Sequence, residues 1–221
     1  MQHDLETQMA AEKEWLDRWK TGPQRTRWKQ LPPQAGDRAP DFELPDSTGA
    51  DLKISTLWNA KPLLLVFWRQ YGCGCGVQRA ERLRNEYPMY ADANVAVIGQ
   101  GEPERAAAYA AKYELPRVPI LCDPDFKAYE AYGLLEGKES QLLFDAPLSM
   151  QDRDLQAGLD FCTERKAAGR PPVDNPWLLP GEFVIDSRGV LRLAYRYNYC
   201  EDYPDPRVLV ASIREATMSP T

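Results

Sequence analysis

Short apolar runs alternate with helix-like segments along most of the chain. Residues 63–68 (LLLVFW) and 94–99 (NVAVIG) are continuous apolar runs of the kind that a sheet buries on both faces, and residues 118–123 (VPILCD) form a third. Apolar positions at helical spacing follow them, at residues 77–90, 103–113 and 124–133. We therefore predict three buried strands connected by helices.

The C-terminal part predicts a hairpin and a closing helix. Residues 181–197 (GEFVIDSRGVLRLAYRY) are two extended runs joined at the turn Ser187-Arg188-Gly189, and Asp205-Pro206 opens a last helical segment. Two shorter extended runs lie earlier, in residues 40–54. Strand–helix–strand units followed by a hairpin and a helix indicate an α/β fold, a central mixed sheet with helices on both faces.

Outside this pattern lie an arm and an insertion. Residues 4–20 have helical spacing and precede a linker rich in proline and glycine, so we assign residues 1–33 to an N-terminal helical arm and linker and residues 34–221 to one domain. Residues 137–178 are an insertion with one helical candidate, residues 152–168. The arm and linker contain Trp15, Trp19 and Trp28. These side chains pack either on their own domain or on another subunit, and in the second case the arm forms a homodimer.

Composition limits the partners. The 221 residues are 43% hydrophobic, enough for one sizeable core, and the formal charge of −6 argues against binding nucleic acid. The charged N-terminus does not read as a secretory signal, and no apolar stretch reaches transmembrane length. We therefore expect a cytoplasmic protein with no membrane contact.

The histidine and cysteine content excludes several site types. His3 is the one histidine, so serine triads, cysteine–histidine hydrolases and histidine-rich zinc sites lack their imidazole. Five cysteines are too few and too unevenly placed for a disulfide scaffold. Any disulfide would then be a transient, redox-active one.

Cys73-Gly74-Cys75 is the motif that indicates chemistry. It lies between a predicted buried strand and a predicted helix, at the edge of the sheet where open α/β folds place their sites. A helix N-terminus favours a thiolate over a thiol, and the nearby Arg69 and Arg79 add to that effect. Two residues of extended chain span roughly 6.6–7.2 Å, so the backbone must turn at Gly74 for the two sulfurs to bond.

The order of several segments resembles a known family. GDRAPDFELPDSTGADLKI, LLLVFWRQYGCGC, VAVIGQGEPE, LCDPDFKAYEAYGL and LPGEFVIDSRGVLR are similar to the thioredoxin-like redoxins, most of all the AhpC/TSA peroxiredoxin-like branch, over about Gln34 to Ala216. The resemblance implies a thioredoxin-like fold, redox activity through Cys73 and Cys75, and a thiol reductant of the thioredoxin or glutathione type. It places Cys73 at the first cysteine position.

Departures from the family leave the oxidant open. Peroxiredoxins of the main type carry proline seven residues, and threonine or serine three residues, before the peroxidatic cysteine. The corresponding residues before Cys75 are Trp68 and Gly72, and those before Cys73 are Val66 and Gln70. The substrate is therefore either a peroxide or a protein disulfide.

The resemblance also implies a role for Pro180. Leu179-Pro180 matches the position of the cis-proline that thioredoxins hold opposite their cysteines, which would leave the Leu179 backbone to pair with a substrate peptide.

We further assign side chains that line the site and the remaining cysteines. The lining residues are Trp68, Arg69, Tyr71, Gly72, Gly74 and Pro180. Cys200, after the last strand, is either a distal resolving cysteine or a partly buried free thiol, whereas Cys122 and Cys162 are packing residues.

Three functions are compatible with these residues. The first is a thiol-disulfide oxidoreductase or peroxiredoxin-like antioxidant protein in which Cys73 attacks and Cys75 resolves. The second is a module that binds a soft metal ion, Cu(I) or Zn(II), for which Cys122 or Cys200 would have to converge on the pair. The third is a non-catalytic interaction protein with the same fold. On the first reading we expect no cofactor and no metal.

Overall fold

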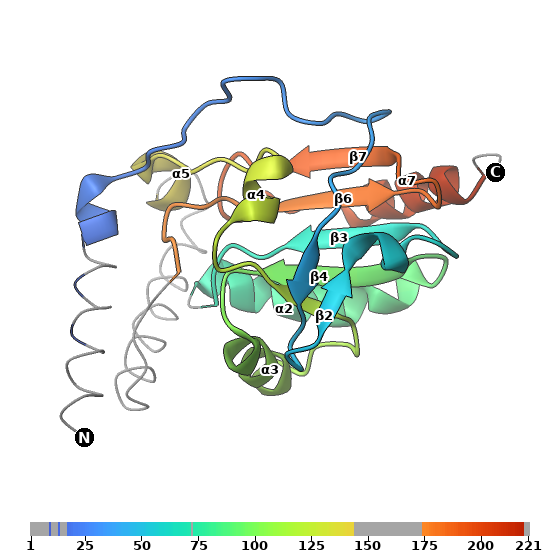
Figure 1. Cartoon of the computed structure of the whole chain (residues 1–221), viewed down its shortest axis with the longest axis horizontal. Helices are drawn as coiled ribbons and strands as arrows, with labels where there is room; N and C mark the ends of the chain where they lie inside the picture. The colour runs from blue at the N-terminus through green and yellow to red at the C-terminus, as the bar shows by residue number, and fades with distance from the viewer. Residues whose placement is uncertain (1–8, 10–12, 14–16, 72, 144–173, 219–221) are drawn as a thin grey trace.

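A five-stranded mixed sheet forms the centre of the molecule (Figure 1). The computed structural model describes residues 9, 13, 17–71, 73–143 and 174–218. The sheet has the order β5-β4-β3-β6-β7, in which β3, β4 and β5 are parallel and β6 and β7 run antiparallel to their neighbours. Its strands are β3 (Leu63–Phe67), β4 (Asn94–Gly99), β5 (Ile120–Cys122), β6 (Gly181–Ile185) and β7 (Leu191–Arg196). These strands confirm the predicted α/β class.

Helices cover both faces of the sheet, as predicted. One face packs against α2 (Gly74–Glu86), α3 (Pro103–Lys112) and α7 (Pro206–Met218). The other face packs against α4 (Lys127–Ala131), the 3-10 helix η1 (Ile54–Leu57) and the hairpin of β1 (Glu43–Pro45) and β2 (Asp51–Lys53). Alternate residues of β3 point to the two faces, which is why its apolar run is continuous.

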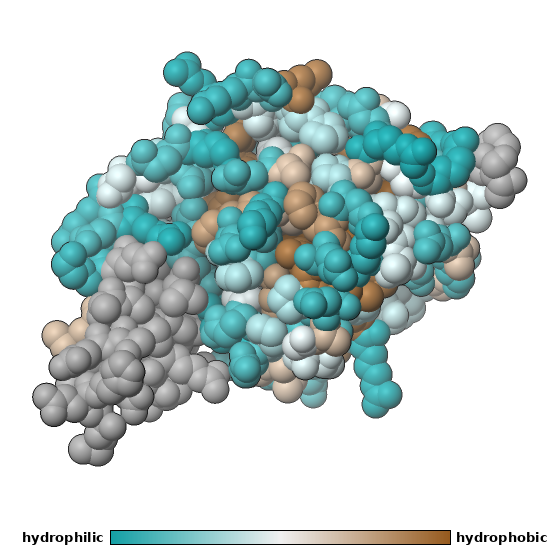
Figure 2. All heavy atoms as spheres, in the orientation of Figure 1, coloured by the Kyte–Doolittle hydropathy of each residue, from teal (hydrophilic) through white to brown (hydrophobic). Residues whose placement is uncertain are grey.

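The surface agrees with this arrangement. On the face shown in Figure 2, hydrophobic residues gather near the middle, over the sheet and the β1–β2 hairpin, and hydrophilic residues surround them. Among the described residues, no helix is both long and apolar enough to cross a membrane.

Two predicted helices are shorter than expected. The segment after the third strand becomes helical at Lys127 and not at Asp123-Pro124, because Phe126 adopts a left-handed conformation with φ 61°. Asp123 caps the helix, since its carboxylate accepts the N–H groups of Lys127 and Ala128 at 3.1 and 2.8 Å. The helix after the cysteines ends at Glu86 and continues as the 3-10 turn η2 (Tyr87–Tyr90).

The N-terminal arm packs on its own domain. Residues 9, 13 and 17–21 are helical, and the rest of the predicted helix, Trp15 included, lies outside the described residues. Trp19 stacks on Trp177 with ring centroids 4.5 Å apart, and Trp28 Nε1 donates to the Gly133 carbonyl at 2.8 Å. A homodimer through the arm stays a prediction.

The described ends of the insertion both return to the domain. It begins with α5 (Glu139–Leu143), and its helical candidate and Cys162 lie outside the described residues. At its far end, Asn175 N donates to Gln100 Oε1 at 2.7 Å and Leu178 bridges to Glu136. Residues 174–178 therefore pack beside the carboxyl ends of β3 and β4.

Candidate functional site

The cysteine pair lies where the central strand β3 leads into α2. Cys73 is the N-cap of α2 in extended conformation, and its carbonyl accepts the N–H groups of Gly76 and Val77 at 3.0 and 3.2 Å. Cys73 and Cys75 form a disulfide with a Cα–Cα separation of 5.2 Å. This separation is shorter than that of extended chain, so the predicted turn at Gly74 is present. The first turn of α2 thus carries both sulfurs.

The two cysteines differ in exposure. Cys73 is 9% exposed and Cys75 is 2% exposed, and both pack against Leu179. Cys73 is therefore the more exposed residue of the pair. Cys75 instead points toward the protein, into a small cavity that Arg69 and Pro180 also line.

Of the two arginines expected near the cysteines, one is in place. Arg69 Nη1 lies 4.0 Å from Cys75 Sγ, and Arg69 Nη2 donates to the Pro176 carbonyl. A guanidinium at that distance favours the thiolate form of Cys75 once the disulfide is reduced. The charge of Arg79 is engaged elsewhere, because its Nε and Nη2 donate to the two carboxylate oxygens of Glu182 at 2.8 and 3.1 Å. Arg79 thus fixes α2 to β6.

The loop after β7 lies against the start of α2. Tyr203 Oη donates to the carbonyl of Cys75 at 2.8 Å, and Tyr197 Oη donates to Glu182. On its other side the loop contacts α5, where the Cys200 N–H donates to the Gln141 carbonyl at 3.3 Å. These contacts hold residues 197–203 over the cysteine pair.

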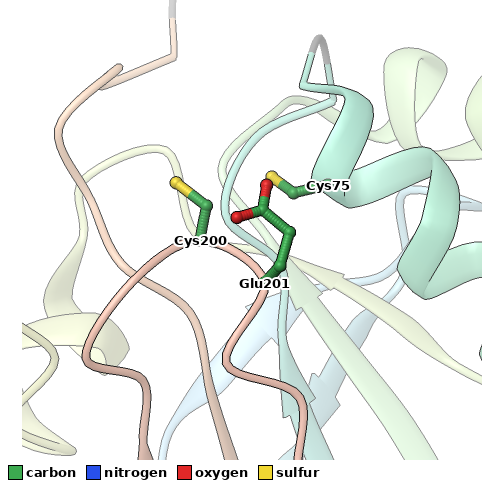
Figure 3. Close-up of side chains that lie close together, drawn as sticks. All are labelled: Cys75, Cys200 and Glu201. Carbon is green, nitrogen blue, oxygen red and sulfur yellow. The ribbon is translucent and has the colours of Figure 1, made fainter. Parts of the chain in front are cut away.

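Cys200 and Glu201 meet Cys75 at this point (Figure 3). The two sulfurs and a Glu201 carboxylate oxygen all lie within 4.8 Å of one another, and all three residues are buried. Figure 3 shows the Glu201 carboxylate reaching from the loop toward Cys75. Cys200 is buried, as one reading held, and it also lies next to Cys75, as the other reading required.

Cys122 does not join them. It is fully buried in β5 within the core, as predicted for a packing residue. Burial, with smaller contributions from Glu102 and Asp46, raises the pKa of the Cys122 thiol to about 12, so it stays protonated at neutral pH.

Tyr71 anchors the loop rather than facing the cavity. Its N–H donates to Asp174 Oδ2 at 3.0 Å, and Asp174 Oδ1 pairs with Arg105. Burial raises the pKa of Tyr71 well above its usual range, so the phenol stays neutral. Sequence reasoning missed Asp174, whose signal was weak: an acidic residue two positions from Pro172 and Pro176, within a segment assigned to the insertion.

Of the other residues that were predicted to line the site, some line the cavity and one also packs beneath the loop. Trp68 and Pro180 line the cavity with Cys75 and Cys200. Trp68 also supports the loop from below, where its Nε1 donates to Tyr109 Oη at 3.0 Å. Gly72 lies outside the described residues.

The expectation of a cis peptide bond before Pro180 is wrong. The described peptide bonds are all trans, the lower-energy form, and the Leu179 N–H donates to the Leu135 carbonyl at 2.9 Å. The Pro180 carbonyl accepts the Tyr197 N–H at 3.1 Å. The backbone at Leu179 is therefore already paired within the chain and does not offer its N–H to a substrate peptide.

Comparison with known proteins agrees with this fold. The model of the AhpC/TSA family matches residues 35–194, which is most of the chain. The chain belongs to the AhpC/TSA family. Its described sheet and helices have the thioredoxin-like arrangement of that family.

Curated relatives are bacterial peroxiredoxins. Peroxiredoxin Bcp of Escherichia coli is 32% identical over 105 residues, which cover 47% of this chain and 66% of that protein. The match thus spans slightly less than two thirds of the relative's length. A bcp relative from Helicobacter pylori is 31% identical over 114 residues, or 48% of this chain and 73% of the relative.

Solved structures share the fold at lower identity. Peroxidoxin BcpB of Mycobacterium tuberculosis has a TM-score of 0.55 at 20% identity, covering 83% of this chain and 97% of its own. A thiol peroxidase from Chromobacterium violaceum has a TM-score of 0.59 at 16% identity, covering 87% and 91%. These similarities support the thioredoxin-like fold.

Proposed function

We propose that this AhpC/TSA chain is a peroxiredoxin-like thiol oxidoreductase whose reaction centre is the Cys73–Cys75 pair. One observation carries the proposal: the two sulfurs are bonded to each other in the first turn of the helix that follows the central strand. The helix N-terminus and Arg69 both favour thiolates there. Cysteines in this environment are reactive, whereas a buried thiol such as Cys122 is inert.

The exposures of the two cysteines support different roles for them. Cys73, the more exposed sulfur, attacks one oxygen of a hydroperoxide as the thiolate, becomes a sulfenic acid and releases water or an alcohol. The Cys75 thiol then attacks the Cys73 sulfur, so that the disulfide forms and a second water leaves. The peroxide has taken up two electrons from the two thiols.

A small oxidant fits the site better than a protein disulfide. The Leu179 N–H that would pair with a substrate peptide is bonded within the chain, and the cysteines are 9% and 2% exposed. A peroxide needs neither a paired backbone nor a wide opening. The reductant must return two electrons to the disulfide, and a dithiol of the thioredoxin type or glutathione supplies them. We place the cycle in the cytoplasm, where such thiols are kept reduced.

Loss of free thiols tests the proposal. Reduced protein is exposed to hydrogen peroxide, and in a parallel series to a peptide disulfide, while free thiols are counted over time. We expect two thiols to disappear with peroxide, and the rate to fall by about 100-fold or more in Cys73→Ser because the nucleophile is absent. Cys75→Ser should stop at a sulfenic acid that a dimedone probe traps, and Cys122→Ala is the matched control with an unchanged rate.

Two results would contradict the proposal. Equal rates in Cys73→Ser and the wild type would remove Cys73 from the reaction. No thiol loss with either oxidant would instead favour a non-catalytic interaction protein on the same fold.

Cys200 is proposed as the distal resolving thiol. Its sulfur lies within 4.8 Å of Cys75 Sγ, so it can attack that sulfur with little movement of the backbone. The attack forms a Cys75–Cys200 bond, breaks the Cys73–Cys75 bond and releases Cys73 as a thiolate. The centre would then be ready to react again before external reductant arrives.

A trapping experiment tests the role of Cys200. In wild-type protein oxidised with hydrogen peroxide and then treated with an alkylating agent, peptide mapping by mass spectrometry should find Cys75 bonded to Cys200 and Cys73 alkylated. The same treatment of Cys122→Ala should give the same bond. Oxidised protein in which Cys75 is bonded only to Cys73, or to any cysteine other than Cys73 and Cys200, would rule out the exchange.

A further inference from the structure

Cys75, Cys200 and Glu201 bring three possible metal-ligand atoms close together. Within the part of the chain that the structure describes, they are the one group of Cys, His, Asp and Glu side chains whose ligand atoms converge. They come from two elements far apart in the sequence, the first turn of α2 and the loop after β7. All three are buried.

The three ligand atoms are close enough for a single ion after a small movement. A cavity of ≈ 10 Å³, room for about one water-sized particle, lies beside Cys75 and Cys200, although Glu201 does not line it. In a tetrahedral zinc site the ligand atoms lie roughly 3.5–3.8 Å apart. The three ligand atoms lie within 4.8 Å of one another, so a contraction of at most roughly 1.0–1.3 Å would bring them to zinc distance.

The charges at the site also balance for a divalent ion. Two thiolates and one carboxylate carry three negative charges, and a divalent ion brings two positive ones. Arg69, whose Nη1 lies 4.0 Å from Cys75 Sγ, supplies the third. The charges of these named groups therefore sum to zero with the ion bound, which lowers the desolvation cost of a buried site.

We infer that the reduced protein binds one zinc ion through Cys75 Sγ, Cys200 Sγ and the Glu201 carboxylate. Zinc accepts thiolate and carboxylate ligands together, whereas Cu(I) prefers sulfur ligands, so Glu201 favours zinc. Three protein ligands leave one position of a tetrahedral ion open. Binding displaces the protons of the two thiols.

Oxidation would release the ion. When hydrogen peroxide oxidises the pair, the sulfurs of Cys73 and Cys75 give up two electrons and bond to each other, and the peroxide, with two protons, leaves as water. Cys75 then no longer offers a thiolate, and the remaining two ligands hold the ion poorly. The binding of zinc to the reduced form does not depend on the proposed catalytic role of Cys73; its peroxide-driven release does.

Zinc uptake by the full chain tests the inference. Protein reduced with a phosphine and freed of metal is mixed with excess Zn²⁺ and desalted, and its zinc content is measured by mass spectrometry of the metal. We expect about one zinc per chain. Cys200→Ser and Glu201→Gln, which nearly preserve side-chain size, should each weaken binding by at least about tenfold, since loss of even an outer partner of a metal ligand costs that much.

Controls separate this site from other zinc binding. Cys122→Ala should keep full uptake, and Co²⁺ in place of zinc should show thiolate-to-cobalt charge-transfer absorption that disappears in Cys200→Ser. Uptake below one zinc per ten chains, or equal uptake in Cys200→Ser and Cys122→Ala, would overturn the inference. Both zinc measurements are made without oxidant. A failure to bind zinc would therefore not contradict the proposed thiol chemistry, and an unreactive Cys73 would not contradict zinc binding.

Discussion

Gly99 ends β4 directly beneath the ring of Tyr71. A Cβ at position 99 would lie 1.9 Å from Tyr71 Oη and 2.5 Å from Tyr71 Cζ, far inside van der Waals contact. The absence of a side chain therefore lets Tyr71 fold back onto the sheet, from where its N–H reaches Asp174. Gly101 contributes in the same way, since a Cβ there would lie 2.9 Å from the Tyr71 ring.

We predict that Gly99→Ala destabilises the protein by about 1–3 kcal/mol, the usual cost of adding atoms to a packed core. Urea unfolding measures the change. Gly99→Ala/Tyr71→Phe should recover part of the loss because it removes the oxygen with the shortest contact, and the buried Tyr71 Oη has no hydrogen-bond partner among the described residues. If the single variant were as stable as the wild type, Tyr71 would not be fixed by this contact.

At the residue scale, the sequence predicted the importance of the two cysteines but not that of the residues that surround them in the fold. The glycines around Cys73 and Cys75, and their place between strand and helix, predicted a turn and a reactive pair. Glu201 and Asp174 carry no such pattern, because their roles depend on contacts with residues distant in the chain.

At the scale of elements, α2 and β6 are joined by a buried ion pair. The Arg79 side chain is 7% exposed and that of Glu182 1%, and Tyr197 adds a hydrogen bond to the same carboxylate. Burial alone would lower the pKa of Arg79, but Glu182 and its neighbours outweigh it, so the pKa lies above its ordinary value and the guanidinium stays charged. The pair holds the start of α2 in place under the cysteines.

Arg79→Met should destabilise the protein by about 3–5 kcal/mol, because it leaves a buried carboxylate without its partner. Arg79→Met/Glu182→Leu should lose less, since no buried charge then remains. Arg84→Ala is the surface control: its pair with Glu114 is largely exposed, so its effect should stay below about 1 kcal/mol. Urea unfolding compares the three, and equal losses in Arg79→Met and Arg84→Ala would contradict the argument.

The elements themselves were predictable because their apolar periodicity is strong. β3 is buried at every position, and α7 follows the proline that was expected to open it. The start of α4 was misplaced by a few residues because a left-handed Phe126 has no sequence signature. The loop of residues 197–203 was not predictable, since polar loops have no period.

At the scale of the whole molecule, segments remote in sequence converge on one edge of the sheet. The arm reaches Trp177 through Trp19, the end of the insertion reaches Arg69 through Pro176, and the loop after β7 reaches Cys75 through Tyr203. The sequence predicted the order of strands and helices along the chain. It did not predict that these segments meet, because the residue pattern of one sequence does not report distances between loops. The candidate site is thus a product of the tertiary structure.

The single residue between Cys73 and Cys75 has a thermodynamic consequence. A cross-link stabilises a fold mainly by reducing the chain entropy of the unfolded state, and the effect grows with the enclosed loop. For a sequence separation of 2, the gain is roughly 1.6 kcal/mol, about half that of a 15-residue loop. The protein can therefore exchange electrons at this bond many times while its margin against unfolding changes little.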